Sequence, residues 1–394
     1  MYRTGDRRGI IPVSVLATID PVLRDSALFG LLTDAPGVVA TRHDIYEDHL
    51  RRVVLDATGV IEDVLVPLEH ACLSCAVRED AVPTIARLAR DGRWDHVLLA
   101  LPTSAEPLPA ARALAAETVR GGDLDHTRIA TSFTVVDIDT LQHDLLGDDT
   151  LLERGLGLTT GDERSVGEAL AAQIEQADLV VTHTSHAEPT EAPSATPSGL
   201  LDRLRGAGTR RVDGLHSLTA AALAAARHSP ARAEHRAHPL GAVAISGRGS
   251  DPEDRSWTLE LRSPLPFHPE RLLERIESLG AGGLRARGVF HVADRPGLAC
   301  LWDGAGGQLA VGDLGPWSEV CAGTPPHTRI VVVGVADAVD ADAVGPDAAV
   351  LLDERQRLRE AFHAALCTPE EAAAGVEWLW REDHLAPWLG ARTV

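Results

Sequence analysis

The chain has 394 residues, which is long enough for two domains with substantial hydrophobic cores. Its formal net charge of −21 argues against direct nucleic-acid binding, which depends on positive charge, and favours basic protein partners. The sequence has no run of about 18 apolar residues and no basic-then-apolar leader, so we expect no membrane contact. Five cysteines are too few for a disulfide scaffold, so we expect a cytoplasmic protein.

The sequence contains neither lysine nor asparagine, so all 37 residues counted as lysine or arginine are arginine. A Schiff-base lysine and a phosphate-loop lysine are therefore excluded. An Asn-Lys-x-Asp loop for guanine recognition is excluded as well.

Short β-branched runs alternate with amphipathic segments through the first half of the chain. Ile11–Leu16 and Val38–Ala40 have the composition of buried strands, and Ala81–Arg90 has apolar residues at helical spacing. We predict further strands at 51–55, 60–68, 95–100, 129–136 and 177–181, and helices at 110–119 and 168–176. This alternation predicts an α/β domain with a doubly wound sheet.

The segment after the 60–68 strand holds the most unusual chemistry in the chain. His70, Cys72 and Cys75 offer an imidazole and two thiols, and these soft donors suit zinc. A closed tetrahedral site needs a fourth ligand, from elsewhere in the chain or from water. The alternative is that both cysteines are small buried hydrophobes, and a single Cys-x-x-Cys pair leaves both interpretations open.

A predicted strand is followed by the motif Ala71-Cys72-x-x-Cys75-x-x-Arg78-Glu79-Asp80, by a helix and then by Arg93–Leu99. With this order, the chain resembles the CobW-type metallochaperone GTPase family over roughly residues 11 to 390. The resemblance implies a P-loop NTPase-like doubly wound sheet and a C-terminal α+β domain of the CobW type. The family carries Cys-x-Cys-Cys, whereas Ser74 replaces the middle thiol here. This version is similar to an actinobacterial branch that, in mycobacteria, recruits a ribosome hibernation factor to ribosomes in a zinc-dependent way.

The resemblance also implies a ligand after the second strand, where the family has a glutamate that helps to bind metal or magnesium. His43 or Glu47 could supply this fourth ligand. Polar loop side chains usually face water, so a solvated loop over 41–48 is the alternative.

The family's glycine-rich phosphate loop corresponds to residues 17–26, which contain no glycine. Pro21 removes a backbone donor, and two aspartates would repel phosphate. Arg24 falls where the family has its lysine, followed by Asp25 and Ser26. A guanidinium fork does not replace a compact ammonium in that cradle, so we expect a degenerate P-loop without productive GTP or magnesium binding.

Two other nucleotide motifs of the family are altered in the same way. Ala100–Thr103 stands where the family has Glu-Thr-Thr-Gly, and 182–188 replaces the base-reading loop. This second segment holds His183 and His186, but loop histidines without a partner motif are usually plain surface. We expect the scaffold to persist without its phosphate and base sites.

We predict a degenerate GTPase-like domain over 10–228, a linker over 229–244 and a second domain over 245–390. Three histidines at 228, 235 and 238 give the linker region the composition of a weak metal tract, with a solvated linker as the alternative.

The second domain resembles the family's C-terminal domain, which opens with Pro266-Phe267-His268-Pro269-Glu270-Arg271-Leu272 in this chain. Its predicted order of strand, helix, three strands and helix indicates an α+β module with helices on one face of the sheet. Three tryptophans near the end of the chain either pack onto this domain or form a docking edge: Trp378, Trp380 and Trp388.

Two functions of different classes follow from these observations. The first is a zinc-responsive adaptor without productive GTP hydrolysis, which recruits a ribosome hibernation factor under zinc limitation and reaches the ribosome only through that basic protein. The alternative is a GTP-dependent metallochaperone that delivers zinc or cobalt to a client. No catalytic nucleophile is predicted, because Ser74 lacks a Gly-x-Ser-x-Gly elbow.

Overall fold

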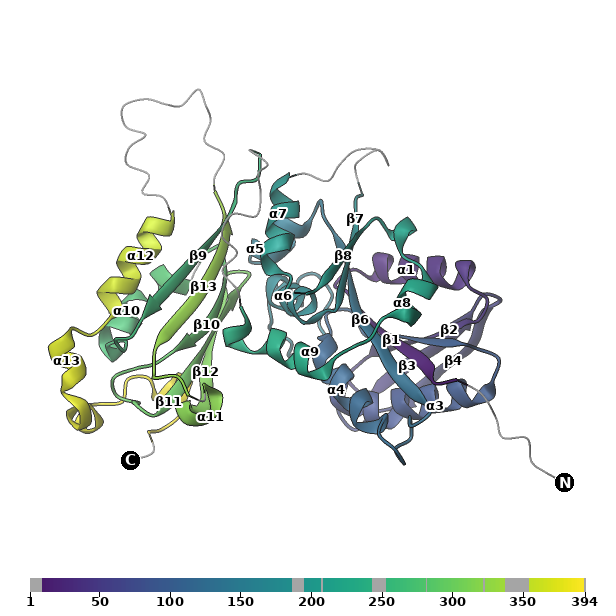
Figure 1. Cartoon of the computed structure of the whole chain (residues 1–394), viewed down its shortest axis with the longest axis horizontal. Helices are drawn as coiled ribbons and strands as arrows, with labels where there is room; N and C mark the ends of the chain where they lie inside the picture. The colour runs from purple at the N-terminus through teal and green to yellow at the C-terminus, as the bar shows by residue number, and fades with distance from the viewer. Residues whose placement is uncertain are drawn as a thin grey trace. The chain divides into compact units, whose positions relative to one another are not determined.

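The computed structural model describes residues 9–185, 195–206, 208–242, 253–280, 282–321, 323–336 and 354–392. These residues form two compact units, drawn in Figure 1. Of the described residues, unit 1 contains 9–140, 150–185 and 208–237. Unit 2 contains 141–149, 195–206 and the described residues from 238 onward.

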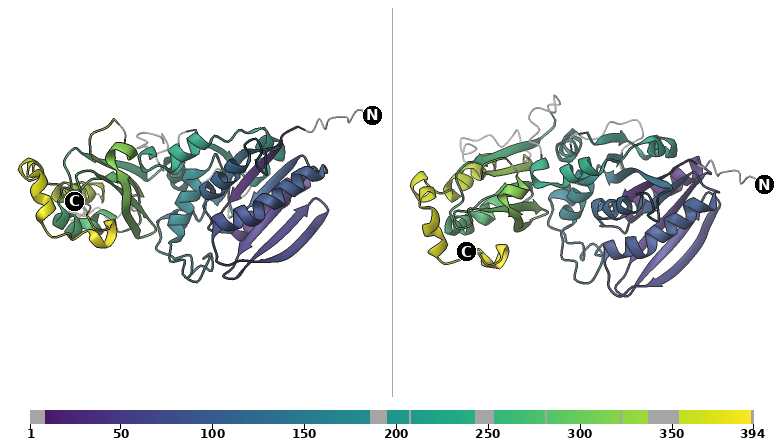
Figure 2. Two further views of the ribbon diagram at one scale, coloured as in Figure 1. Left: turned by 90° about the horizontal axis from the view of Figure 1, so that it is seen from below. Right: turned by 60° about the horizontal axis from the view of Figure 1, so that its bottom comes forward.

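Unit 1 is built on an eight-stranded sheet in the order β4-β3-β2-β5-β1-β6-β7-β8. The six strands from β2 to β8 in this order are parallel, whereas β3 and β4 are antiparallel additions at one margin. Figure 2 shows the β3–β4 pair at that margin. The strands are β1 (Ile11–Ala17), β2 (Val38–Ile45), β3 (His49–Asp56), β4 (Gly59–Pro67), β5 (His96–Ala100), β6 (Thr127–Asp137), β7 (Leu179–His183) and β8 (Arg210–Asp213).

Helices cover both faces of this sheet, as the alternating sequence predicts. One face packs against α1 (Pro21–Asp34) and α8 (Ala220–Ala225) through a core that includes Leu28 and Phe133. The other packs against α3 (Val82–Asp91) and α4 (Pro107–Glu117) through a core that includes Ile85 and Leu114. Every residue of β5 is buried, which is typical of a parallel strand covered on both faces. Helix α6 (Val166–Gln176) completes the predicted alternation.

Two segments differ from the sequence-based expectation, and a third is divided by a helix cap. The helix expected from Ala81 continues an earlier turn, because α2 (Leu73–Ala76) is joined to α3 by a π-helix, η1 (Val77–Ala81). Thr219 divides the alanine-rich segment 216–227. Its side chain accepts a hydrogen bond from the Ala222 N–H and caps the start of α8, while the 3-10 helix η2 (Leu215–Ser217) precedes the cap. Residues 229–244, expected as a linker, include α9 (Pro230–Ala237) and the 3-10 helix η3 (Pro239–Gly241).

Unit 2 contains a five-stranded antiparallel sheet in the order β12-β11-β10-β13-β9. Strands β11 and β12 form a hairpin, and Gly306 and Gly307 between them have φ values of 58° and 71° that suit a two-residue turn. The strands are β9 (Ser256–Ser263), β10 (Arg285–Phe290), β11 (Leu298–Ala305), β12 (Gln308–Pro316) and β13 (Thr328–Val335).

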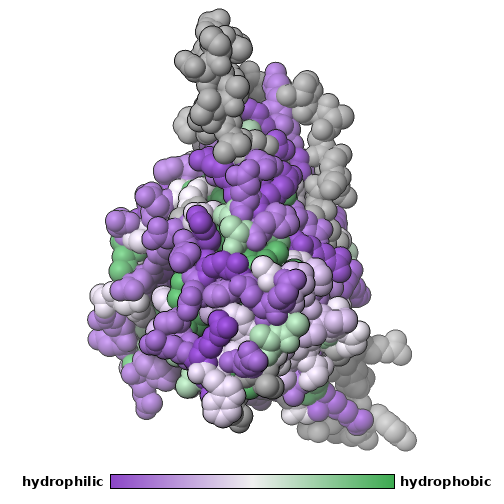
Figure 3. Space-filling model, turned by 90° about the vertical axis from the view of Figure 1, so that its left-hand side faces the viewer, coloured by the Kyte–Doolittle hydropathy of each residue, from purple (hydrophilic) through white to green (hydrophobic). Residues whose placement is uncertain are grey.

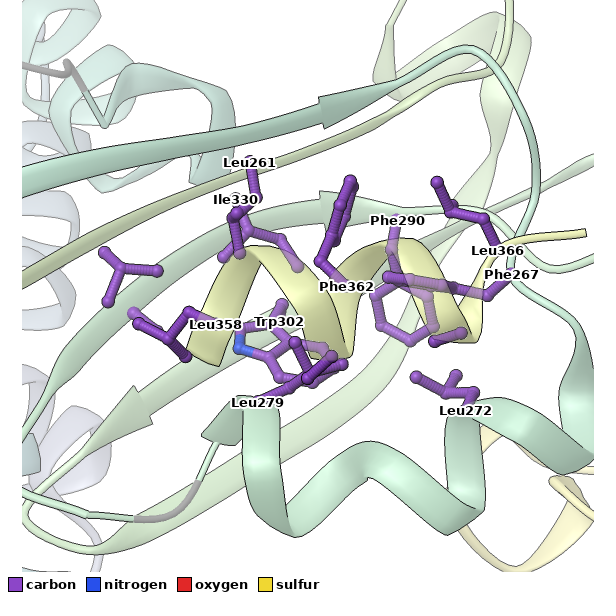
Figure 4. Close-up of a cluster of buried hydrophobic side chains, with 14 of the residues drawn as sticks. Leu261, Phe267, Leu272, Leu279, Phe290, Trp302, Ile330, Leu358, Phe362 and Leu366 are labelled. Atoms are coloured by element: carbon purple, nitrogen blue, oxygen red, sulfur yellow. The ribbon is translucent and has the colours of Figure 1, made fainter. Parts of the chain in front are cut away.

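One face of this second sheet packs against α10 (Pro269–Gly280) and α12 (Glu354–Ala365), in agreement with the predicted α+β module. The core between them is aromatic (Figure 4), with Phe362 edge-on to Phe267 at 5.5 Å between ring centroids. The unit also takes in α5 (Leu141–Leu146) and α7 (Ala195–Leu204) from earlier in the sequence. Its remaining helices are α11 (Trp317–Val320), α13 (Pro369–Ala373), η5 (Gly375–Trp380) and α14 (Ala386–Leu389).

The three tryptophans of the tail have different surroundings. Trp378 is buried and its indole N–H donates to the Glu371 carbonyl at 2.8 Å, so it packs onto the domain. Trp380 and Trp388 are 84% and 51% exposed. Figure 3, which views the molecule from the side of α10, α12 and α13, shows a mainly hydrophilic face with small separate apolar areas. No helix within the described ranges is long and apolar enough to cross a membrane.

Candidate metal centre

The two cysteines lie one helical turn apart at the start of α2. Cys72 is the N-cap residue, with extended backbone angles, and its carbonyl accepts from the Ala76 N–H at 2.9 Å. Cys75 follows three residues later, so both thiols lie on the same side of the first turn. Leu73 between them packs against buried side chains of unit 1 and fixes the turn to the domain.

The structure brings the three predicted ligands together. The nearest ligand atoms of His70, Cys72 and Cys75 all lie within 4.8 Å of one another, and Sγ of Cys75 is 3.4 Å from Nε2 of His70. His70 is exposed and both cysteines are partly buried. Sulfur and imidazole nitrogen at these separations fit a zinc ion, which needs one more ligand to complete a tetrahedron.

The two thiols ionise differently because they are hydrogen-bonded to each other. The Cys75 backbone N–H donates to the Cys72 sulfur and lowers the pKa of Cys72. The Cys75 thiol donates to the Cys72 sulfur, and this bond raises the pKa of Cys75. Cys72 is therefore the first of the two to become a thiolate, which is the form that binds a metal.

Neither residue suggested as a fourth ligand joins this cluster. His43 lies on β2, where its side chain is buried and its Nε2 is hydrogen-bonded to Oδ1 of Asp80 at 2.7 Å. Glu47 accepts a hydrogen bond from the Thr160 hydroxyl. Among the described residues, the cluster of possible ligands contains His70, Cys72 and Cys75 alone.

A buried ion-pair network holds the metal-binding segment on the sheet. Asp80, on the π-helix η1, contacts His43 on β2 and the guanidinium of Arg52 on β3. Arg52 also lies 3.6 Å from Glu62 on β4, which pairs with Arg87 on α3 at 2.7 Å. No local sequence pattern predicts these contacts, although Asp80 belongs to the segment that carries the family resemblance.

The region that corresponds to the family's phosphate loop contains charged groups that pair with other groups of the protein. Asp20 caps α1, and its Oδ1 accepts from the Val22 and Leu23 N–H groups at 2.7 and 2.9 Å. The Arg24 side chain is buried, 2.8 Å from Asp44 and 3.1 Å from the Leu101 carbonyl. Asp25 pairs with Arg42 at 3.0 Å, while Ser26 is exposed on α1.

The remaining histidine predictions have separate outcomes. His183 is the last residue of β7, and His186 lies outside the described residues. Nδ1 of His228 is 2.7 Å from Asp178, which also pairs with Arg236 at 2.6 Å. His228 therefore takes part in an ion-pair network of unit 1.

Two protein-family models match parts of this chain. Residues 42–193 match the family model described as the CobW/HypB/UreG nucleotide-binding domain, and residues 256–346 match the cobalamin synthesis protein cobW C-terminal domain. These matches, with the sheet topologies, confirm the predicted combination of a doubly wound α/β domain and a CobW-type α+β domain.

Among similar proteins, a zinc-regulated GTPase metalloprotein activator 1 of Dictyostelium discoideum is 25% identical over 288 residues, covering 69% of this chain and 58% of its own length. A zinc chaperone of Mycobacterium tuberculosis is 28% identical over 320 residues, covering 74% of this chain and 71% of its own. The alignment with the crystal structure of the Zn(II)-bound YjiA GTPase of E. coli covers 91% of this chain and 100% of the YjiA chain, with 12% sequence identity and a TM-score of 0.36. The chain is therefore similar to the CobW/HypB/UreG nucleotide-binding domain over residues 42–193 and to the CobW C-terminal domain over residues 256–346.

Proposed function

We propose that this protein is a zinc carrier of the metallochaperone type, which holds one zinc ion on His70, Cys72 and Cys75 and passes it to a client protein. The observation that carries the proposal is the convergence of one imidazole and two thiols within 4.8 Å at the surface of unit 1. A structural zinc site is closed by four protein ligands, whereas three leave one position for water or an incoming ligand.

An open position suits zinc transfer. A thiolate or imidazole of the client would take the fourth position, and the protein's own ligands would then leave one at a time, so the ion is never released into solution. The exposed His70 is the ligand with the least restraint from the surrounding structure. The mycobacterial relative named as a zinc chaperone, and the Dictyostelium relative named as a zinc-regulated metalloprotein activator, support zinc as the cargo.

We further propose that this carrier does not use a nucleotide held by the phosphate loop. Helix N-termini bind phosphate through free backbone N–H groups, and here the Asp20 carboxylate already accepts two of them. Arg24, at the lysine position, is paired with Asp44. Both features support a carrier that works by ligand exchange with its client.

The adaptor function predicted from the sequence, in which a hibernation factor is recruited to ribosomes under zinc limitation, remains a prediction. The names of the relatives support zinc delivery better than recruitment. The net charge of −21 suits a basic partner in either case.

Zinc stoichiometry tests the proposal. The purified protein should bind one zinc ion in competition with a chromophoric chelator, and Cys72→Ser and Cys75→Ser should each abolish tight binding. Cys321→Ser is the matched control, because this buried cysteine lies in the small core of unit 2 that contains Val289 and Trp317. Unchanged zinc binding in both Cys72→Ser and Cys75→Ser would show that the proposed function is wrong.

A further inference from the structure

Strand β4 is an open edge of the eight-stranded sheet. It pairs with β3 on one side, and within the described part of the chain its other side pairs with no strand. An edge of this kind presents backbone N–H and C=O groups to any extended chain that approaches it. Sheets recruit peptides in this way, with main-chain hydrogen bonds giving affinity and alternate side chains giving specificity.

The side chains of β4 do not protect this edge. Val60 and Leu65 are each 66% exposed, and Ile61 and Val64 are each 38% exposed. Natural edge strands are usually short or carry unpaired charge. β4 has nine residues, and its two charged residues are paired with arginines of neighbouring elements: Glu62 with Arg87 and Arg52, and Asp63 with Arg51.

The end of β4 is also the start of the metal-binding segment. The strand ends at Pro67, and the Leu68 N–H then donates to the Asp48 carbonyl at 2.9 Å. Val66 and Ala71 pack with Ile45 in one small core, so the ligand loop is fixed directly to the end of the strand. A chain paired with β4 would therefore have one end beside the zinc ligands.

The charges at that end favour a basic chain. Asp48, Glu69 and Glu79 are exposed carboxylates around the ligand loop, with Arg78 as a neighbouring cation. The chain as a whole carries a net charge of −21. Complementary charge would speed the encounter with a basic segment and orient it.

From these observations we propose that β4 is the docking edge for an extended, basic segment of the client, which adds to the sheet as an antiparallel strand and places a cysteine or histidine at the fourth zinc position. The inference rests on the proposed zinc-carrier function and adds the partner's chemistry to it. Because β4 runs toward the ligand loop, the ligand residue must stand at the amino end of an antiparallel segment. A parallel segment would need the ligand residue at its carboxyl end, so the position of this residue distinguishes the two pairings.

Designed peptides test the polarity. The probe is an eight-residue peptide that alternates arginine with valine after an amino-terminal cysteine, with a fluorophore at its carboxyl end. We expect it to bind the zinc-loaded protein at least tenfold more tightly than two relatives: one with serine in place of cysteine, and one with the cysteine at the carboxyl end. Anisotropy titrations with and without zinc measure this difference.

Protein variants test the edge. Val60→Lys with Leu65→Lys should weaken binding of the amino-terminal cysteine peptide at least tenfold and leave zinc affinity unchanged. The matched control is Val22→Lys with Phe29→Lys, which changes residues that are 70% and 72% exposed on α1 and should affect neither measurement.

Three results would overturn the inference. The first is equal affinity of the protein for the peptides with amino-terminal and carboxyl-terminal cysteine, and the second is unchanged peptide affinity in the Val60→Lys, Leu65→Lys variant. The third is a zinc-loaded dimer, seen in analytical sedimentation, that this variant abolishes. The last result would assign the edge to a second copy of this chain. Zinc affinity is measured on the protein alone, so failure of the zinc-carrier function is recognised separately.

Discussion

Nη1 of Arg24 lies 2.8 Å from Oδ1 of Asp44, and the two side chains are only 6% and 19% exposed. Arg42 contacts the other oxygen of the same carboxylate, with its Nε at 3.1 Å. At the position where family members carry a phosphate-binding lysine, the positive charge is thus neutralised inside the protein. The pair therefore has a structural role that can be measured.

The first prediction concerns this pair. Asp44→Ala removes the nearest carboxylate of the buried Arg24 guanidinium and leaves, among the described residues, only the Asp25 carboxylate at 3.8 Å, so we expect the free energy of unfolding of unit 1 to fall by about 3 kcal/mol. Urea unfolding followed by circular dichroism measures the change. Asp63→Ala is the control, since its pair with Arg51 is more exposed, with side chains that are 43% and 42% exposed, and its loss should cost much less. Equal losses in the two variants would contradict a buried structural pair.

The second prediction separates structural from metal-binding histidines. His43→Gln removes the imidazole partner of the buried Asp80, which keeps its contact with Arg52, so we expect a loss of about 2 kcal/mol in unfolding free energy. It should keep one zinc ion per chain, because His43 lies outside the ligand cluster. His70→Gln should show the opposite pattern, with weakened zinc binding and little change in stability. Loss of zinc in His43→Gln would restore this residue as a ligand.

The third prediction is a dependence of stability on pH. Burial lowers the pKa of His96 to about 4, while the unfolded chain keeps a value near 6.5. The folded state binds its proton later than the unfolded state as pH falls, so stability is lost progressively from about pH 6.5 down to about 4. Between pH 7.5 and pH 5 the group should cost about 2 kcal/mol.

His96→Gln should remove this part of the pH dependence from the unfolding of unit 1. His143→Gln is the control, because that side chain is 69% exposed and should leave the dependence unchanged. An identical pH profile in the wild type and His96→Gln would show that the histidine protonates freely in the folded protein.

The local pattern of the sequence predicts much of the fold. The β-branched runs and helical spacings predict most strands and helices of unit 1, because buried parallel strands such as β5 are apolar along their whole length. The proximity of His70, Cys72 and Cys75 is also predictable, because the three are close in sequence and the two cysteines share a helical turn.

The contacts that join distant segments could not be predicted in this way. The sequence predicts that His43 is a polar residue of a loop. In the structure, the pairing of β2 with β3 and the packing of η1 bring His43 to Asp80 and bury it. Thr219 divides the alanine-rich segment 216–227. The composition of this segment does not show where the helix begins, because a cap depends on local backbone geometry. The inclusion of α7 in unit 2 depends on contacts with β9, such as that of Arg203 with Ser256 at 2.7 Å.

The fourth prediction concerns nucleotide binding. Calorimetry with GTP and magnesium should show no saturable binding, which corresponds to a dissociation constant above about 1 mM. Arg24→Lys should not restore it, because the Asp20 carboxylate still occupies the first N–H groups of α1 and residues 17–26 still contain no glycine. Circular dichroism should show that each sample is folded. Micromolar GTP affinity in the wild type would mean that Asp20 and Arg24 exchange their internal partners for phosphate, and it would favour a GTP-dependent metallochaperone.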